Sequence, residues 1–453
     1  MILRPALLIA VSLLLVASPA RADVAFRGLA YSRLNLDLRQ DNPYEDNLEW
    51  HNKVFFQVKA DRDEDTQAVF SVLGEHNTYS GRTTRLEYDL SLYEGYVRLR
   101  RRNWSFYLGK QLVDWSQSDV SVLDSINPRD LTEFVTREDE FIKIPTLMAR
   151  AVYTGENDSW EFLYEPFYTP SKLRLYGTDW SLLSNKAVGE YQGQIDTNTF
   201  MQQGYKPGID DYPAYNGVNG SLAARWVHHG DQFDYQLQAF NGWAVLPLFD
   251  FNKDFAKYLA AQPEGARRTL ETLSPQEVIA YSPLYKSRPA RQTQLGAGLS
   301  GAVGESTVRA EVAVVEPQQL YTNNFELTEH TVVSATAGID RFFFGGKVYG
   351  NLAYVGAFVG QYPAEGLYLA KQFNHFAVGV LRGSFFDDQF TPEARAILQI
   401  PQADYMLNVR LPLRVSDNTQ VAAGVYYFDG PGESIFGQFR ENSFFYTQLR
   451  YAF

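Results

Sequence analysis

The sequence predicts an all-β protein, a transmembrane antiparallel up-and-down β-barrel of about 18 strands, with 16 as the alternative count. Three observations predict this fold. Apolar and polar residues alternate with a period of two along most of the chain. The 29 Tyr, 31 Phe and 7 Trp are typical of barrels that carry aromatic girdles at the two lipid–water interfaces. Long and short connections between the alternating stretches also follow one another in a regular order.

The alternation gives each expected strand two different faces. In "KVFFQVKAD", for example, Val54, Phe56 and Val58 share one face. The segments with this pattern are 24–38, 48–61, 65–77, 85–101, 103–113, 145–154, 157–168, 219–229, 231–243, 291–303, 305–316, 328–341, 344–358, 366–384, 390–400, 403–415, 419–428 and 440–453. In the fourth segment the alternation changes phase near Leu92 and Tyr93, which predicts a β-bulge there.

The lengths of the connections are consistent with an outer-membrane barrel. Counted from a periplasmic N-terminus, the long connections 114–144, 169–218 and 244–290 follow strands 5, 7 and 9, as long outer loops should. The short connections are 61–65, 101–103, 385–389 and 415–419. These short turns follow even-numbered strands, which places them on the periplasmic side.

The two ends of the chain predict export. Residues 1–22 carry Arg4, an apolar run and the small-x-small triplet "ARA", so we expect a signal peptide cleaved before Asp23. The mature barrel would then be 23–453, in the bacterial outer membrane. No later apolar run approaches 18 residues, which argues against transmembrane helices. The absence of Cys excludes disulfides, thiolate zinc sites and cysteine nucleophiles.

The C-terminal stretch "SFFYTQLRYAF" predicts the closing strand of the barrel. An open sheet edge would leave backbone groups unpaired in hydrocarbon, so the last strand must pair with the first. Its terminal aromatic residues, Tyr451 and Phe453, resemble the signal by which the outer-membrane assembly machinery recognises its clients.

An acidic stretch at 108–141 is the candidate pore constriction. Its candidate residues are Lys110, Asp114, Asp119, Asp124, Arg129 and Asp130. The segment could be a solvated surface loop or could fold into the barrel and narrow the lumen, and the sequence leaves both open. In the second case it would face lumen charges, for which the candidates are Lys53, Lys59, Arg309, Glu311, Arg410 and Arg450.

The same stretch resembles a large family of mostly uncharacterised bacterial outer-membrane proteins allied to the alginate-export porins. The matching residues are Gly109-Lys110-Gln111, Trp115, Asp119, Asp124, Asn127-Pro128, Asp130, Pro145, Arg150 and the "YYFDG" at 426–430. Lys110 stands where that family has Arg, and Ser116 where it has Gly. The resemblance adds Asn127 to the candidate site and implies export of an acidic polysaccharide as an alternative function.

Two other patterns receive structural interpretations. Residues 296–301 fit G-x-G-x-x-G, but a turn and another strand follow them, so close packing against small residues is a better account than a dinucleotide site. Residues 253–261 and 274–281 are predicted helices within the connection 244–290. They could form a cap over the mouth of the barrel or a plug inside it.

The predicted function is a porin-like channel for passive diffusion of small hydrophilic solutes, because a barrel of about 18 strands encloses an aqueous lumen. Its expected partners are the lipid bilayer, lipopolysaccharide, the assembly machinery and the solutes, and a homotrimer remains open. We expect no cofactor, no metal, no enzymatic activity and, at a net charge of −12, no nucleic-acid binding. The alternatives are polysaccharide export, a barrel hydrolase and a sheath for periplasmic cytochromes.

Overall fold

The structure is a computed structural model of the chain. It describes residues 23–38, 48–79, 85–118, 120–173, 180, 208–261, 280–281, 283, 285–324, 326–432 and 434–453. The predicted signal peptide, most of the predicted helix at 274–281 and the candidate Asp119 lie outside the described residues.

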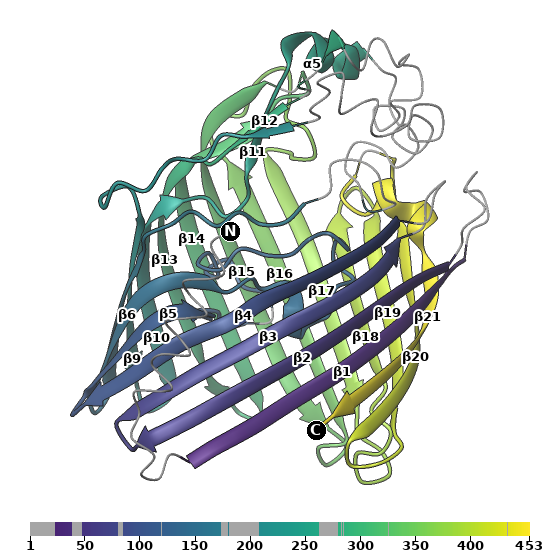
Figure 1. The fold of residues 1–453 in the computed structure, drawn as a ribbon. Coiled ribbons are helices and arrows are strands. Elements are labelled where there is room, and N and C mark those ends of the chain that lie inside the picture. The colour runs from purple at the N-terminus through teal and green to yellow at the C-terminus, as the bar shows by residue number, and fades with distance from the viewer. Residues whose placement is uncertain are drawn as a thin grey trace.

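Within this described part, 18 antiparallel strands form one closed sheet (Figure 1). They are β1 (Asp23–Asp37), β2 (Leu48–Asp63), β3 (Thr66–Tyr79), β4 (Arg85–Arg101), β5 (Trp104–Gln111), β6 (Thr146–Thr154), β7 (Asp158–Glu165), β9 (Ser221–His229), β10 (Phe233–Trp243), β13 (Arg291–Val303), β14 (Ser306–Tyr321), β15 (Leu327–Phe343), β16 (Val348–Val359), β17 (Phe373–Gly383), β18 (Glu393–Ile400), β19 (Asp404–Arg414), β20 (Thr419–Asp429) and β21 (Phe444–Ala452). Each predicted segment overlaps one of these strands. The prediction of an 18-stranded barrel is confirmed, and the alternative of 16 strands is wrong.

The sheet closes where the last strand meets the first. β1 pairs with β2 on one side and with β21 on the other, from Leu29 opposite Ala452 to Asp37 opposite Phe444. Beyond this ladder, Gly28 N–H donates to Phe453 O at 2.7 Å and Phe453 N–H donates to Gly28 O at 3.0 Å. Closure leaves no unpaired sheet edge, as a wall surrounded by hydrocarbon requires.

Side chains alternate between the two sides of this wall. On β2, Val54 is 55% exposed on the outer face, whereas its neighbours Lys53 and Phe55 are buried on the inner face. Large apolar side chains on the outside of other strands, such as Leu90 and Leu352, are also well exposed. An exposed apolar outer face with polar side chains inside is the pattern of a barrel whose outer surface contacts lipid.

The predicted bulge in β4 is confirmed. Val72 pairs with Leu92 and Phe70 pairs with Gly95, so two residues of β4 lie opposite the single residue Ser71. Glu94 N–H donates to the Ser71 hydroxyl at 2.9 Å. The extra residue turns Tyr93 toward the inside of the barrel, and regular strand pairing continues on both sides of the bulge.

The long connections leave the barrel at one rim, and the two ends of the sheet meet at the opposite rim. The connections after β7 and β10 contain a small sheet of β8 (Gly208–Asp210), β11 (Leu248–Phe251) and β12 (Tyr285–Arg288), together with α5 (Lys253–Ala261). The predicted helix at 253–261 is confirmed. Figure 1 shows α5, β11 and β12 above the rim, which favours the cap over the plug. No described helix is long and apolar enough to cross a membrane.

Deleting Phe453 tests the closure. The deletion removes both backbone hydrogen bonds with Gly28 and the ring that lies against this glycine, so the Tm of the purified barrel in detergent should fall. The matched control is Phe386→Ala, which removes an exposed Phe from a turn at the same rim and should leave the Tm unchanged. Equal effects of the two changes would contradict the role of Phe453 in closure.

Candidate functional site: the segment inside the barrel

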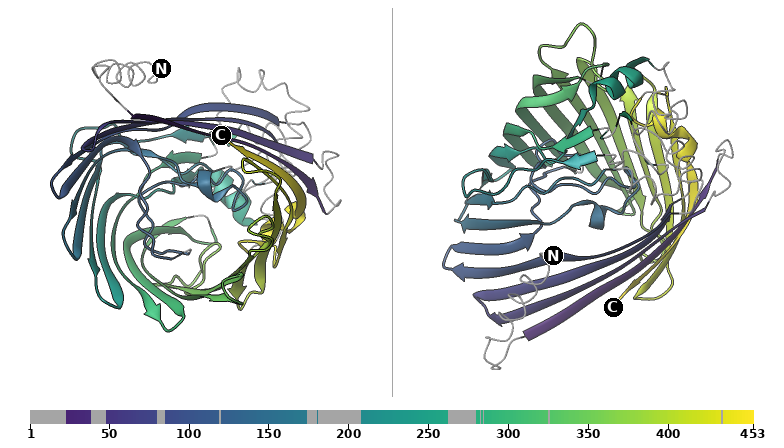
Figure 2. Two further views of the ribbon diagram at one scale, coloured as in Figure 1. Left: turned by 90° about the horizontal axis from the view of Figure 1, so that it is seen from below. Right: turned by 45° about the horizontal axis from the view of Figure 1, so that its top comes forward.

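The described residues of the connection 112–145 between β5 and β6, which are 112–118 and 120–145, lie inside the barrel. Their side chains and backbone contact inward-facing residues on distant strands, including Lys53 on β2, Glu311 on β14 and Arg450 on β21. Figure 2 shows this stretch and its short helix α2 (Asp139–Ile142) within the ring of strands. Of the two interpretations that the sequence left open, the structure has the inward one. We call residues 112–145 the inner segment.

A glycine and an asparagine set the path of the inner segment at its two ends. Gly109 has φ +135°, and a Cβ at this position would lie 2.2 Å from Gly95 O. Val113 N–H donates to Asn127 Oδ1 at 2.6 Å, and Asn127 Nδ2 donates to Ile144 O at 3.0 Å. Asn127 therefore joins the start of the inner segment to its end, which gives a structural reason for its presence in the motif.

Glu311 on β14 holds the first half of the inner segment. The backbone N–H groups of Gln117 and Val122 donate to the Glu311 carboxylate at 2.9 and 3.0 Å. The hydroxyl of Ser121 donates to the same carboxylate at 2.6 Å. Charge-assisted bonds of this kind are stronger than neutral ones, so a single buried side chain fixes this turn against the wall.

The glycines of the G-x-G-x-x-G pattern lie on β13, opposite the inner segment. A Cβ on Gly296 would lie 2.4 Å from Leu123 Cδ2, and a Cβ on Gly298 would lie 2.7 Å from Gln117 Oε1. The interpretation that something packs closely against these small residues is confirmed. The pattern ends within a strand, so no helix opens there to receive a pyrophosphate.

Apolar clusters fix the inner segment at two further places. One cluster joins it to the wall of β6, β7, β9 and β10 and consists of Val113, Trp115, Ile126, Met148, Leu163, Ala223 and Phe240. The other places Phe134 against the aromatic rings of the connection between β20 and β21, with Phe439 at a centroid distance of 4.5 Å. Phe428, from the "YYFDG" motif, belongs to this second cluster.

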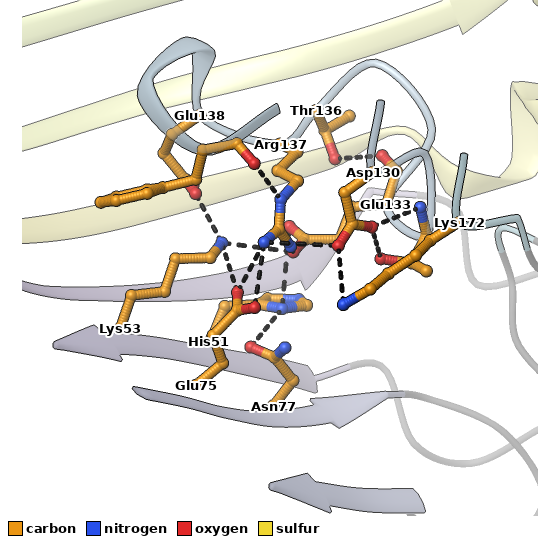
Figure 3. Close-up of polar contacts among 12 residues, drawn as sticks. His51, Lys53, Glu75, Asn77, Asp130, Glu133, Thr136, Arg137, Glu138 and Lys172 are labelled. Carbon is orange, nitrogen blue, oxygen red and sulfur yellow. Dashed lines mark hydrogen bonds and ion pairs between the residues drawn. The ribbon is translucent and has the colours of Figure 1, made fainter. Parts of the chain in front are cut away.

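A buried network of ion pairs joins the inner segment to β1, β2 and β3 (Figure 3). Glu133 lies 2.7 Å from Arg33 and 3.3 Å from Lys53. Glu138 lies 2.5 Å from Lys53 and 2.9 Å from Arg33. Arg137 completes the network through Glu75, at 2.8 Å. Removing one partner from such a buried group costs about 3–5 kcal/mol, because the other charge is left uncompensated.

The network keeps its acidic members ionised. Burial alone would raise the pKa of Glu138, but the charges of Lys53 and Arg33 outweigh burial and lower the pKa to about 2. Burial would also raise the pKa of Glu133. The neighbouring basic groups outweigh burial and hold this pKa well below its usual range; they are Lys53, His51, Arg33 and Arg137. The inner segment is therefore attached by charge at all ordinary pH values.

The tip of the inner segment contacts β18 and β21, and β21 is the neighbour of β1 where the sheet closes. Asp139 and Glu140 begin α2, where they lie 3.2 Å from Arg395 on β18 and 2.5 Å from Arg450 on β21. Unlike the buried network, these pairs are open to solvent, with Asp139 74% exposed and Arg395 34% exposed. This is where charges of the inner segment meet the open lumen.

The predicted constriction residues have other contacts. Asp124 bonds Arg129 at 2.9 Å and Lys143 at 3.0 Å, and Lys143 also bonds Asp114, so these pairs lie within the inner segment. Asp130 is buried near Arg137 and Lys172. Lys110 Nζ donates to Leu92 O at the β4 bulge, at 2.5 Å. These side chains hold the inner segment together and to the wall, while the tip carboxylates Asp139 and Glu140 were missing from the candidate set.

The predicted lumen charges all lie on inward faces, but they differ in what they contact. Lys53 and Glu311 bind the inner segment, as described above. Lys59 pairs with Asp61 at 3.3 Å, and Arg309 pairs with Asp340. Arg410 donates to Gln420 at 3.1 Å, and Arg450 binds the tip.

The described residues contain no group of three or more His, Cys, Asp or Glu that could hold a metal ion. His228 and His229, adjacent on β9, have separate partners, Asp158 at 3.0 Å and Asp234 at 3.2 Å. This agrees with the alternation of side chains on a strand, which points neighbours to opposite faces.

Comparison with known proteins gives remote structural similarity alone. No protein-family model and no curated protein matches this sequence. The outer membrane channel DcaP of Acinetobacter baumannii is 11% identical, with 96% of this chain and 99% of that chain covered and a TM-score of 0.45. OccK5 (OpdH) of Pseudomonas aeruginosa is 8% identical, with 95% and 97% covered and a TM-score of 0.46. An anion-selective porin from Comamonas acidovorans is 9% identical, with 96% and 100% covered and a TM-score of 0.39. At these TM-scores the similarity assigns no function to this chain.

Gly109→Ala tests how the inner segment leaves the wall. A methyl group at this φ clashes with Gly95 O, and holding a non-glycine residue there costs about 1–3 kcal/mol. We expect a lower Tm for the variant. Gly74→Ala is the control, because its Cβ would meet its nearest atom at an ordinary 3.7 Å. An unchanged Tm for Gly109→Ala would contradict the described path.

The pH dependence of stability tests the ion-pair network. Since the pKa of Glu138 falls from 4.5 to about 2 on folding, its contribution is complete above pH 4.5 and is lost as the pH falls toward 2. The difference in Tm between the native protein and Glu138→Gln should therefore be constant above pH 4.5 and shrink below it. A difference that is independent of pH down to 2 would show that Glu138 is not held by charge.

Proposed function

We propose that this chain is a porin-like channel of the bacterial outer membrane, for passive diffusion of small hydrophilic solutes. The observation that carries the proposal is a closed 18-stranded barrel with an apolar outer face and a charged inner face, narrowed by a segment folded into its lumen. Such a barrel is too wide for wall side chains alone to fill. The inner segment reduces the opening without dividing the barrel.

Selection in this channel depends on size and charge, and no bond is made or broken. The described acidic residues expected at the constriction already have basic partners: Asp124 and Asp114 pair with Lys143, Asp124 also pairs with Arg129, and Asp130 pairs with Arg137 and Lys172. The exposed charges of the inner segment include the tip pairs Asp139–Arg395 and Glu140–Arg450, which join it to β18 and β21. Charged groups at a constriction select ions by Coulomb interaction in a confined space.

Export of an acidic polysaccharide is the second candidate. The resemblance at 108–165 to the family allied to the alginate-export porins supports it, and so do Arg395 and Arg450, which the tip contacts. Against it stand the attachments of the inner segment to several walls, because a polymer would require this segment to move. Liposome swelling with oligosaccharides of rising length separates the two, since a channel for small solutes should exclude the longer ones.

The proposal includes assembly of the barrel into the outer membrane. Tyr451 and Phe453 close the barrel at the rim where we place the periplasm, and the exposed outer face of β21 is what the assembly machinery would bind. Lipid and lipopolysaccharide would surround the outer face. A homotrimer and the cleavage of residues 1–22 belong to the same proposal and await direct measurement on the mature protein.

Planar-bilayer conductance of the purified barrel tests the function. We expect stable ion-conducting steps, and their absence from well-folded barrels would contradict the proposal. In a KCl gradient, Asp139→Asn with Glu140→Gln should shift the reversal potential toward anion preference, because two exposed negative charges leave the passage. Asp254→Asn, which changes an exposed carboxylate on α5 outside the barrel, is the control and should not shift it. If the reversal potential of the double variant did not shift, ions would not pass beside Asp139 and Glu140.

A further inference from the structure

The inner segment divides the lumen into two halves of different charge. We call the half between the inner segment and the rim where β1 begins and β21 ends the inner vestibule. Strand pairing determines which side chains face it. Arg98 pairs with Tyr107, and Tyr107 with Arg150, whereas the neighbouring Leu99 and Leu108 are exposed on the outer face. These arginines therefore point into the lumen.

The inner vestibule is lined with cations on both walls. The first wall contributes Arg27, Lys59, Arg98, Arg100, Arg150 and Arg225, and the second contributes Arg309, Arg382, Arg395, Arg410 and Arg450. The carboxylates on the same inward faces are fewer, namely Asp23, Asp61, Glu94, Glu161, Asp234, Asp340 and Glu393, to which the tip adds Asp139 and Glu140. The net charge of this half is positive.

Several donors of the inner vestibule are not used by the protein. The Nε atoms of Arg98 and Arg410 have no hydrogen-bond partner among the described residues, but they are buried, so a solute would meet these two side chains at their terminal Nη groups. Arg150 and Arg225 share the single carboxylate of Glu161, at 2.5 and 2.9 Å. A guanidinium has five N–H donors, so each arginine retains donors for an oxyanion.

The other half of the lumen has the opposite character. There the inward faces of β2, β3 and β4 carry Glu49, Glu75, Glu87 and Asp89. Asp130 lies beside them. The cations around these carboxylates are fewer: Lys53 and Arg33 are occupied by Glu133 and Glu138, Arg137 pairs with Glu75 and Asp130, and Lys172 pairs with Asp89 and Asp130. Charge along the axis therefore changes sign at the inner segment.

We infer that the inner vestibule binds multivalent oxyanions, molecules with several carboxylate or phosphate groups, and receives them from the rim where β1 begins and β21 ends. The inference rests on the proposed channel function and adds a ligand class and a direction to it. Several arginines around a confined space attract an anion with several charges more strongly than a monovalent one. The acidic half on the far side of the inner segment repels the same anion, so capture depends on the side of approach.

Sided block of single channels is the test. The chain has no Cys, so Asn103→Cys, in the turn between β4 and β5, provides one thiol that reports the orientation of the barrel to an impermeant reagent. We expect citrate and tripolyphosphate, added on the side of that turn, to reduce the current at concentrations about tenfold lower than from the other side, and acetate to have no such effect. The asymmetry should weaken at high salt.

A double variant assigns the effect to the vestibule. Arg98→Gln with Arg100→Gln should weaken citrate block by about tenfold, because two charges leave one wall. Arg101→Gln is the matched control, since this exposed arginine is next in the chain, pairs with Asp65 in the turn and faces away from the lumen. Equal block from both sides, or no change in the double variant, would overturn the inference. If citrate and acetate blocked the channel equally, the channel would have only a general anion selectivity. This result would also overturn the inference that the vestibule binds multivalent oxyanions.

Calorimetry separates this inference from the channel proposal. Titration of the folded, detergent-solubilised barrel with citrate measures binding whether or not the barrel conducts. Salt-sensitive binding that is lost in the Arg98→Gln and Arg100→Gln variant supports the vestibule site even if no conductance is found, in which case the channel function alone fails. Conductance without such binding overturns the vestibule site alone.

Discussion

Pairing of every backbone amide around a closed ring is the constraint on which the rest of this structure depends. Hydrocarbon offers no hydrogen bonds to an exposed strand edge, so β21 must pair with β1, and the wall must be continuous. Closure fixes which side chains face outward and which face inward, because neighbours on a strand alternate. The apolar outer face, the polar inner face and a lumen large enough to hold 34 residues of connection follow from it.

The inner segment narrows the lumen at the expense of burying charge. Lys53, Arg33 and Arg137 are taken out of water with Glu133, Glu138 and Glu75, and buried ion pairs give little net stability. These ion pairs fix the position of the inner segment, because a displaced segment would leave their charges unpaired. The same pairing removes Arg33 and Lys53 from the open lumen, so the arginines beyond the segment, which outnumber the carboxylates around them, determine its electrostatics.

Local patterns were sufficient to predict the barrel. The period of two located all 18 strands, the phase change near Leu92 located the bulge, and the glycines on β13 indicated a close contact. Pairing between distant charges could not be predicted this way. Glu138 meets Lys53 because of the path taken by the inner segment, and this path depends on contacts with Glu311 and Phe134 that no local rule supplies. The arginines of the inner vestibule, such as Arg98, carried a usable signal, since they alternate with outward apolar residues on their strand.

The most direct test of the account is a single-Cys spin-label scan of residues 53–58 in lipid vesicles, which the absence of native Cys makes clean. The account predicts that labels at Val54, Phe56 and Val58 are accessible to oxygen dissolved in the lipid, and that labels at Lys53, Phe55 and Gln57 are not. Equal accessibility at all six positions, or access only to a water-soluble reagent, would contradict a closed wall with lipid on one side and the lumen on the other.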